Sequence, residues 1–375
     1  MEKLPPEIFE GIFNYCTVKD ILNVACCSRR YHSMVKPFLW RCVNIPVSFL
    51  FCNGPDLQNL KYTTSLRILD TYNGETLDED SPDNEDLLRG ALENGLLLAK
   101  LLCYCNPLKI SSLHTSLCGK GLEYVSEILC HVKSLKLTCH DQINGEKLDK
   151  LVELEELILR GYHFTSGSLR EIIKGDKLIR LKIHHCESLN QDSLVTIGQK
   201  VDLQRLLIRF SSVERKVDNT PLCSLTNLTH LTIKAAFSSN GLQQLCRSLT
   251  KLKSLNLSRS RFKSEGLAEI QCLTSLTRLS LKFCGGITDR CLDYLVNPLP
   301  LKSLCFSSDL FTPDLFNLTK LGISRLNTLR SLREVVVIDW TNLGNNATIV
   351  INSLCSREKW TLKFCISSKT YTFSR

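Results

Sequence analysis

Cysteine, histidine and carboxylate side chains are the residues of this sequence that could hold a metal or carry out acid–base chemistry. Cys130-His131, Cys139-His140 and the run HHC at 184–186 place such residues side by side. Their spacing does not match the standard zinc arrangements. The adjacent carboxylates Glu155 and Glu156 would point in opposite directions on a strand. With no glycine-rich phosphate loop and no G-x-S-x-G stretch, we expect no metal, no cofactor and no catalytic centre.

Regularly spaced arginine and lysine residues suggest a different chemistry, the binding of anions. Segments such as RLLIRF at 205–210 alternate basic and apolar residues, so on a strand the basic side chains share one face. Arginine binds carboxylate and phosphate groups through a planar fork of donors. We expect an acidic or phosphorylated protein segment to bind at six of these positions: Arg160, Arg180, Lys182, Arg205, Arg209 and Lys234.

The elements that must position these side chains are repeats of the template L-x-x-L-x-L. The second template leucine, or its equivalent, recurs in steps of 22 to 25 residues, with a last step of 31. The template leucines are 135, 157, 181, 206, 231, 255, 279, 304 and 335. LAKLLC at 98–103 fits as an earlier unit, and TSLRILD at 64–70 as a degraded one. Such a period predicts a repeat architecture.

Between these strands the apolar period changes from two residues to that of a helix, as in 168–173, 241–246, 266–270 and 291–295. No strand–turn–helix unit can bury its apolar face alone, so neighbouring units must stack. We expect an α/β fold, a curved leucine-rich-repeat solenoid with parallel strands on the concave side and helices on the convex side. Cys186 and Cys284, three residues past the last strand leucine or its equivalent, resemble the cysteine of cysteine-containing leucine-rich repeats.

Alternation along the strands turns 27 residues of the nine units outward, and nine of these are Lys or Arg while two are acidic. The whole chain has 47 basic and 38 acidic residues, so the bias belongs to this face. A wall of one sign attracts the opposite sign. A nucleic-acid ligand would call for interleaved aromatic residues, and none of the 27 positions is Phe, Tyr or Trp. We therefore expect a protein partner and no nucleic acid.

The rest of the composition indicates the surroundings of the chain. Its longest apolar run, 95–105, carries Lys100 and is too short for a membrane helix, so no membrane is expected. The first residues lack the features of a signal peptide. We accordingly read the 19 cysteines as free thiols packed as small apolar groups, and expect a cytoplasmic or nuclear protein, or one found in both.

Residues 4–43 do not follow the repeat. Pro5 and Pro6 suit the first turn of a helix, and an apolar face follows at Ile8, Ile12 and Phe13. The segments 18–27 and 28–35 predict two more short helices. A helical element of this size buries too little surface to be stable alone, so we expect it to pack against a partner protein or to cap the repeats.

In residue order this segment resembles the F-box. The matching elements are Leu4-Pro5, Glu7-Ile8, Ile12-Phe13, Asp20-Ile21-Leu22, Arg29-Arg30-Tyr31 and Leu39-Trp40-Arg41. Cys16 stands where leucine is usual, and Tyr31 where tryptophan is common; both keep the apolar character. With the repeats, the chain resembles the F-box/leucine-rich-repeat family. The expected domains are an F-box at 1–46, a connecting region at 47–97 with the degraded repeat and an acidic loop, and the repeats at 98–375.

The resemblance implies a substrate receptor of a Skp–cullin–F-box ubiquitin ligase. In that family the F-box docks on the Skp adaptor, which joins it to a cullin, and the repeats hold a protein substrate for ubiquitination and proteasomal degradation. By matching position, the adaptor-binding residues would be Leu4, Pro5, Ile8, Ile12, Phe13 and Leu22. The chain would not itself be an enzyme. The alternatives are a leucine-rich scaffold or inhibitor acting without a cullin, or a terminal segment that only caps the solenoid.

Overall fold

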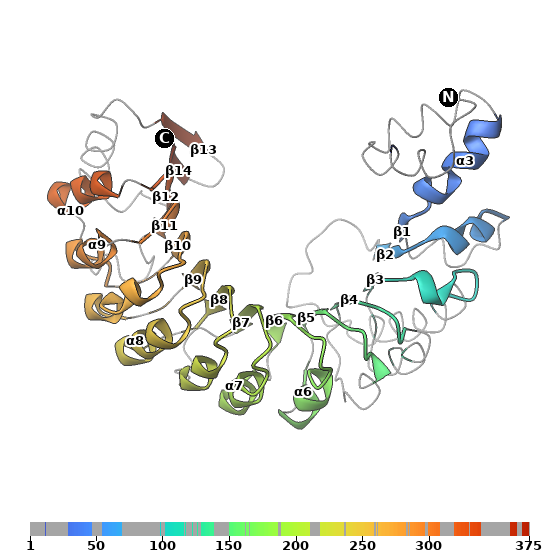
Figure 1. Ribbon diagram of the computed structural model, residues 1–375, viewed down its shortest axis with the longest axis horizontal. Helices are drawn as coiled ribbons and strands as arrows, with labels where there is room; N and C mark the ends of the chain where they lie inside the picture. The colour runs from blue at the N-terminus through green and yellow to red at the C-terminus, as the bar shows by residue number, and fades with distance from the viewer. Residues whose placement is uncertain are drawn as a thin grey trace, which may run out of the picture. The chain divides into compact units, whose positions relative to one another are not determined.

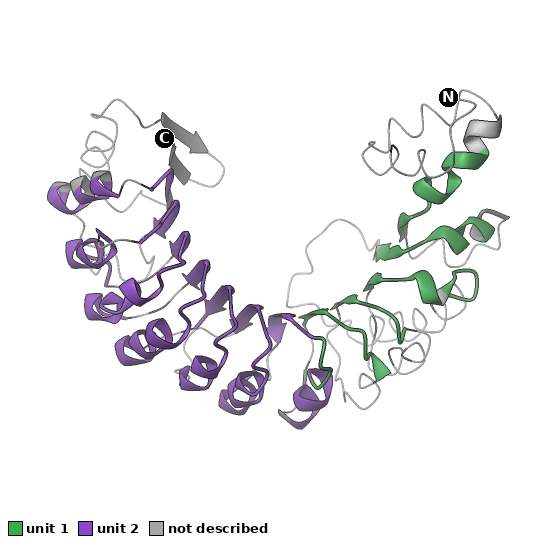
Figure 2. Ribbon diagram, viewed as in Figure 1, with its two compact units in different colours: residues 1–163, 174–177 green, residues 164–173, 178–375 purple. Residues whose placement is uncertain are grey.

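The computed structural model of the 375-residue chain describes residues 12, 29–46, 55–69, 98, 102–115, 117, 122, 126, 129–138, 150–161, 163–164, 166–186, 189–210, 218–235, 238–258, 260, 262–282, 284, 286–296, 299–307, 319–329, 331–338, 361–365 and 370–374. It divides into two compact units, which are described separately (Figure 2). Unit 1 is Met1–His163 with Lys174–Lys177, and unit 2 is Phe164–Ile173 with Leu178–Arg375. Among the described residues no helix has the length and apolarity needed to cross a bilayer.

Unit 1 is a parallel sheet whose strands pair in chain order, preceded by a helix. The strands are β1 (Cys42–Pro46), β2 (Ser65–Leu69), β3 (Ser112–Thr115), β4 (Ser134–Thr138) and β5 (Glu156–Arg160). Its described residues include the α-helix α3 (Arg29–Leu39) and the short 3-10 helices η2 (Pro55–Tyr62) and η3 (Pro107–Lys109). Thr63 is fully buried, and its hydroxyl donates a 2.9 Å hydrogen bond to the carbonyl oxygen of Trp40. This bond ties a residue two positions before β2 to the residue that follows α3.

The start of the repeats differs from the sequence prediction. The strand of the unit predicted at 98–103 is β3, Ser112–Thr115, whereas Leu98 and Leu102 are buried residues in helical conformation. The predicted degraded unit at 64–70 supplies β2, which pairs with β3 in regular register. A strand that the sequence did not suggest, β1, pairs with β2 and lies within the segment predicted as F-box. The parallel sheet therefore begins at Cys42.

The described residues of unit 2 form seven parallel strands followed by an antiparallel pair. The parallel strands are β6 (Arg180–Cys186), β7 (Arg205–Phe210), β8 (His230–Lys234), β9 (Ser254–Ser258), β10 (Arg278–Leu281), β11 (Ser303–Ser307) and β12 (Glu334–Ile338). β14 (Thr370–Ser374) pairs antiparallel with β12, and β13 (Thr361–Cys365) with β14. β12 therefore has a parallel partner, β11, on one side and an antiparallel partner, β14, on the other.

Helices connect the strands of unit 2 and lie together on one side of its sheet (Figure 1). They are α6 (Ser166–Ile172), α7 (Gln191–Gly198), η5 (Thr220–Ser224), α8 (Ser239–Ser248), η6 (Ser264–Leu267), η7 (Ile270–Cys272), α9 (Asp289–Val296), α10 (Lys320–Arg325) and η9 (Leu326–Thr328). The helix expected at 266–270 is thus replaced by the short 3-10 turns η6 and η7. The predicted α/β architecture of leucine-rich repeats is confirmed.

Strand alternation explains why these sequences stack. In β6, β8 and β9 the residues alternate between buried and partly exposed. The template residues Leu181, Leu206, Leu231, Leu255, Leu279, Leu304 and Val335 are register partners from strand to strand, and each is at most 2% exposed. Burying one such side chain contributes about 1.5–3 kcal/mol. The apolar row therefore contributes substantially to the stability of the unit.

A repeated hydrogen-bond pattern fixes the register of the strands. The backbone N–H groups of Gln204 and Arg205 both donate to the carbonyl oxygen of Ile179, and those of Thr229 and His230 donate to Gln204. The pattern continues to β12, where Arg333 and Glu334 donate to Lys302. Because each strand starts at the same height as its neighbour, side chains at equivalent positions form straight rows.

The cysteine predicted at the strand exit packs as expected. Cys186 and Cys284 are fully buried, and the Cys284 thiol donates to the carbonyl oxygen of Leu257 at 3.0 Å. Ser260, at the matching position of another repeat, donates to Ala235 at 2.8 Å and is also fully buried. The position thus takes a small side chain that donates to the backbone of the preceding repeat.

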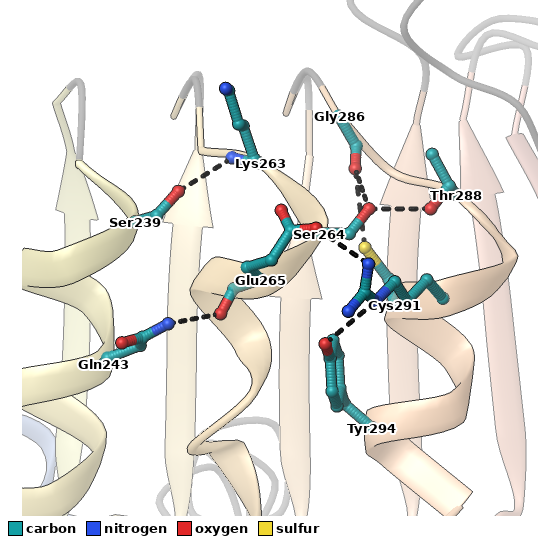
Figure 3. Close-up of polar contacts among 10 residues, drawn as sticks. Ser239, Gln243, Lys263, Ser264, Glu265, Gly286, Thr288, Cys291 and Tyr294 are labelled. Carbon is teal, nitrogen blue, oxygen red and sulfur yellow. Dashed lines mark hydrogen bonds and ion pairs between the residues drawn. The ribbon is translucent and has the colours of Figure 1, made fainter.

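Polar contacts link neighbouring repeats on the helical side of unit 2 (Figure 3). The Gln243 amide donates to the carbonyl oxygen of Glu265 at 2.6 Å, and the Ser239 hydroxyl accepts from the Lys263 N–H at 3.1 Å. One repeat further, the hydroxyls of Ser264 and Thr288 lie 2.7 Å apart. These contacts join consecutive repeats and occupy the polar groups of this side with structural partners.

Candidate functional site

The outward side chains of β6, β7 and β8 form three rows across unit 2. Register places Arg180, Arg205 and His230 in the first row, at the start of the strands. Lys182, Leu207 and Thr232 form the middle row, and His184, Arg209 and Lys234 the last. Adjacent strands are about 4.8 Å apart, so neighbours within a row are close enough to act on one ligand.

These nine positions contain five Lys or Arg residues, two histidines and no carboxylate. Arg205 and Arg209 are exposed, and the other seven side chains are partly exposed. Five of the six predicted substrate-binding residues therefore lie together on three consecutive strands: Arg180, Lys182, Arg205, Arg209 and Lys234. We call this set of nine residues the basic face.

The sixth predicted residue, Arg160, is the last residue of β5 and belongs to unit 1, where its side chain is exposed. In that unit it is the register partner of Thr138.

The ion pairs of unit 2 show how other cations of the unit are used. Arg247 pairs with Glu269 at 2.7 Å and Arg290 with Glu265 at 3.1 Å, both between neighbouring repeats on the helical side. Within the described part of the chain, neither Arg205 nor Arg209 forms an ion pair. Their charge is thus available to a ligand, whereas that of Arg247 is already balanced.

The pKa of His230 reflects the positive charge around the first row. Burial lowers the pKa of its imidazole, and the charges of Arg205, Arg278 and Lys253 lower it further. The ring is therefore neutral at physiological pH. It can accept a proton when an anion approaches, because a nearby negative charge favours the charged form.

The character of the sheet changes beyond β8, toward the C-terminal end of unit 2. β9 presents Ser254, Asn256 and Ser258, and the last two bond to one another at 3.0 Å. In the first row at the far end of the unit, the Ser303 hydroxyl donates to the Glu334 carboxylate at 2.8 Å. The positive charge is thus concentrated on β6–β8, with a weaker second group at Arg278 and Lys282.

One outward position is not accessible. Cys305 of β11 is only 8% exposed, and burial raises the pKa of its thiol. Alternation along its strand places this residue among the 27 positions predicted to face outward. An anion or peptide on this side of unit 2 would therefore meet the side chains of β6–β10 rather than this thiol.

Unit 1 carries a second row of basic residues that the sequence did not reveal. Arg67, His114 and Lys136 are register partners on β2, β3 and β4. Burial lowers the pKa of His114 to about 4, and the charges of Lys136 and Arg67 add to the effect. Arg67 lies in the segment predicted as a degraded repeat. Its place between two apolar residues, in the sequence LRI, is the pattern that could have indicated an outward side chain.

Five of the predicted adaptor-binding residues, Leu4, Pro5, Ile8, Phe13 and Leu22, lie outside the described residues. Ile12 is described: it is helical and 45% exposed. An isoleucine exposed to this extent has apolar surface to offer a partner. For metals, the described residues contain no group of three or more His, Cys, Asp or Glu side chains that could hold an ion.

Comparison with known protein families identifies the class of the N-terminal part, and the fold identifies that of the rest. The strand and helix pattern described above is that of leucine-rich repeats. Residues 1–46 match the F-box-like family. The chain thus carries an F-box-like segment followed by leucine-rich repeats. Both are protein-interaction modules, which indicates a role in protein–protein interaction.

Two solved structures are similar to the chain at low identity. An internalin (inlF) of Listeria monocytogenes is 15% identical, with a TM-score of 0.43, over 77% of this chain and 80% of the other. TLR13, solved in complex with ssRNA13, is 14% identical, with a TM-score of 0.40, over 80% of this chain and 37% of TLR13. A search of curated proteins finds no match.

Proposed function

We propose that this protein is a substrate receptor of a Skp–cullin–F-box ubiquitin ligase. The F-box-like segment at 1–46 would dock on the Skp adaptor, and through it on the cullin. The repeats would hold a protein substrate for ubiquitination and degradation by the proteasome. The observation that carries the proposal is the presence in one chain of an F-box-like segment and of a repeat face lined with cations.

In this proposal the chain has no catalytic role, and ubiquitin transfer belongs to other subunits. It acts in the cytoplasm, the nucleus or both. Its substrate carries acidic or phosphorylated residues, which bind at Arg160, Arg180, Lys182, Arg205, Arg209 and Lys234. Exposed arginines suit such a partner because their planar guanidinium groups form paired hydrogen bonds with carboxylate and phosphate groups.

Affinity purification from cells treated with a proteasome inhibitor tests the adaptor half of the proposal. The wild-type chain should recover the Skp adaptor and a cullin, and a chain lacking residues 1–45 should recover neither. Alanine at Ile12 and Phe13 should have the same effect, because it removes the apolar contacts at the docking surface. Loss of the adaptor with retention of the substrate is the pattern expected from both changes.

The substrate half is tested by glutamate at Arg180, Arg205 and Arg209. This variant should lose substrate and keep the adaptor. A charge-matched control replaces Lys263, Lys302 and Arg333 with glutamate, all exposed residues outside the outward strand positions, and should keep both. A wild-type chain that recovers protein partners but never the Skp adaptor would contradict the ligase proposal and favour a scaffold or inhibitor that acts without a cullin.

A further inference from the structure

The central strand of the basic face, β7, presents two exposed arginines with an apolar residue between them. Arg205, Leu207 and Arg209 all point outward, two residues apart along the strand. Each arginine lies in a row with other basic groups: Arg180 and His230 beside Arg205, and His184 and Lys234 beside Arg209. The face thus offers two groups of cations.

The distance between the two groups follows from the strand. A strand rises about 3.3 Å per residue, so the rows of Arg205 and Arg209 are about 13 Å apart. The space between them belongs to the middle row, where Leu207 and its partner Thr232 present apolar groups. On the other side of Leu207, its register partner Lys182 adds a cation to the middle row.

An extended polypeptide has the spacing that this arrangement requires. Its alternate side chains point the same way, so residues i, i+2 and i+4 face one surface, and i and i+4 are also about 13 Å apart. In a helix the same two residues would be about 6 Å apart, which is too close to reach both rows. A nucleic-acid strand is disfavoured because none of the nine residues of the basic face is Phe, Tyr or Trp, the large aromatic side chains on which bases stack in single-strand binding sites.

We propose that the basic face has two anion subsites separated by an apolar one, and that it recognises an extended protein segment with acidic or phosphorylated residues four positions apart around a central apolar residue. Arg180, Arg205 and His230 form the first anion subsite. His184, Arg209 and Lys234 form the second, and Leu207 contacts the central side chain. The inference rests on the proposed function, because it assumes that this face receives a protein partner.

Peptide binding to the purified full-length chain tests the spacing directly. The probes are labelled peptides of one composition, each with two phosphoserines and one leucine in a serine- and glutamine-rich background, measured by fluorescence anisotropy at about 0.15 M salt. The phosphoserines are placed two, three, four or six residues apart. The peptide with a spacing of four and a central leucine should bind roughly tenfold tighter than any other. Glutamate in place of phosphoserine should keep this order at lower affinity.

Variants of the protein assign the subsites. Arg205→Glu and Arg209→Glu should each weaken the spacing-four peptide by roughly tenfold or more, since each reverses a charge in one subsite. Lys302→Glu, an equal change of charge at an exposed residue just before β11, should have little effect. Leu207→Asn should weaken the peptide that has a central leucine and leave one with a central asparagine unchanged.

The outcomes separate this inference from the proposed function. Equal affinity at all spacings, or an oligonucleotide that competes as well as the best peptide, would overturn the two-subsite inference. The spacing series uses the wild-type protein, so it remains decisive even if a variant fails to fold. If peptide affinity does not depend on spacing, but the charge-reversal variant still fails to recover substrate from cells, the receptor proposal is supported and the two-subsite inference is not. If spacing matters but the Skp adaptor is never recovered, the subsites stand and the receptor proposal fails.

Discussion

Arg205 and His230 are register partners on β7 and β8, and the imidazole carries a lowered pKa because it is partly buried and faces the charges of Arg205, Arg278 and Lys253. A neutral histidine next to an arginine leaves part of the first anion subsite uncharged at physiological pH. Acidification adds a positive charge there. The histidine therefore links ligand binding to pH.

The affinity of the basic face for anions should rise as pH falls. A peptide with two glutamates four residues apart is the suitable probe, because its carboxylates stay charged from about pH 7.5 to about pH 5.5 while phosphoserine loses charge near pH 6. Binding to the wild-type chain should strengthen over this range. His230→Gln should bind about as well at pH 7.5 and gain less on acidification. An identical gain in both proteins would show that His230 does not contribute.

His114 should make the stability of unit 1 depend on pH. Burial and the nearby Lys136 and Arg67 lower its pKa to about 4, below its ordinary value of 6.5, so the unfolded chain binds the proton more readily. Stability is then full above about pH 6.5 and is lost as pH falls toward 4. His114→Gln should reduce this loss, as measured by thermal unfolding at about pH 7 and about pH 5. If the variant loses as much stability on acidification as the wild type does, then other groups cause the effect.

The strands of the repeats could be predicted from the sequence because their signal is periodic and redundant. The nine strands expected around template residues 135 to 335 are present as β4 to β12. The error at 98–103 arose because a short apolar run fits a strand template and a buried helical turn equally well. β3, with Leu113 and little other apolar content, gave a weak signal, and β1 gave none.

The candidate site was partly predictable for a related reason. Alternation shows which strand residues face outward, so Arg180, Arg205, Arg209 and Lys234 could be grouped in advance. Their arrangement in rows depends on the register between strands, which is set by backbone hydrogen bonds that no residue type encodes. The inaccessibility of Cys305 could not be foreseen from alternation either, because it depends on tertiary packing.

The strand-exit position should tolerate cysteine better than alanine. Ser260 is fully buried and donates to the Ala235 carbonyl oxygen, and Cys284, at the same repeat position, donates to the Leu257 carbonyl oxygen of the repeat before it. Ser260→Ala should lower the stability of unit 2 by about 1 kcal/mol, because a buried carbonyl loses its partner. Ser260→Cys should lose less, since a thiol still donates there. Urea unfolding of both variants tests this order, and a reversed order would contradict the equivalence of the two positions.

Gly198, at the end of α7, should be intolerant of any side chain. A Cβ atom there would lie 2.3 Å from the carbonyl oxygen of Pro221 in η5, a backbone atom that cannot move aside alone. The Ser224 hydroxyl also donates to the Gly198 carbonyl oxygen at 2.5 Å, which holds the two repeats together.

Gly198→Ala should therefore force α7 and η5 apart and destabilise unit 2 by about 1–3 kcal/mol. Gly175→Ala is the matched control, because a Cβ there would meet only the Leu151 carbonyl oxygen, at an ordinary 3.8 Å. It should change stability by less than about 0.5 kcal/mol. Hydrogen exchange resolved by peptide distinguishes local from global effects: the first variant should lose protection in 191–198 and 220–224, and the control should not. Equal protection in the two variants would mean that α7 and η5 can accommodate the added Cβ atom. The close approach at Gly198 would then not be required.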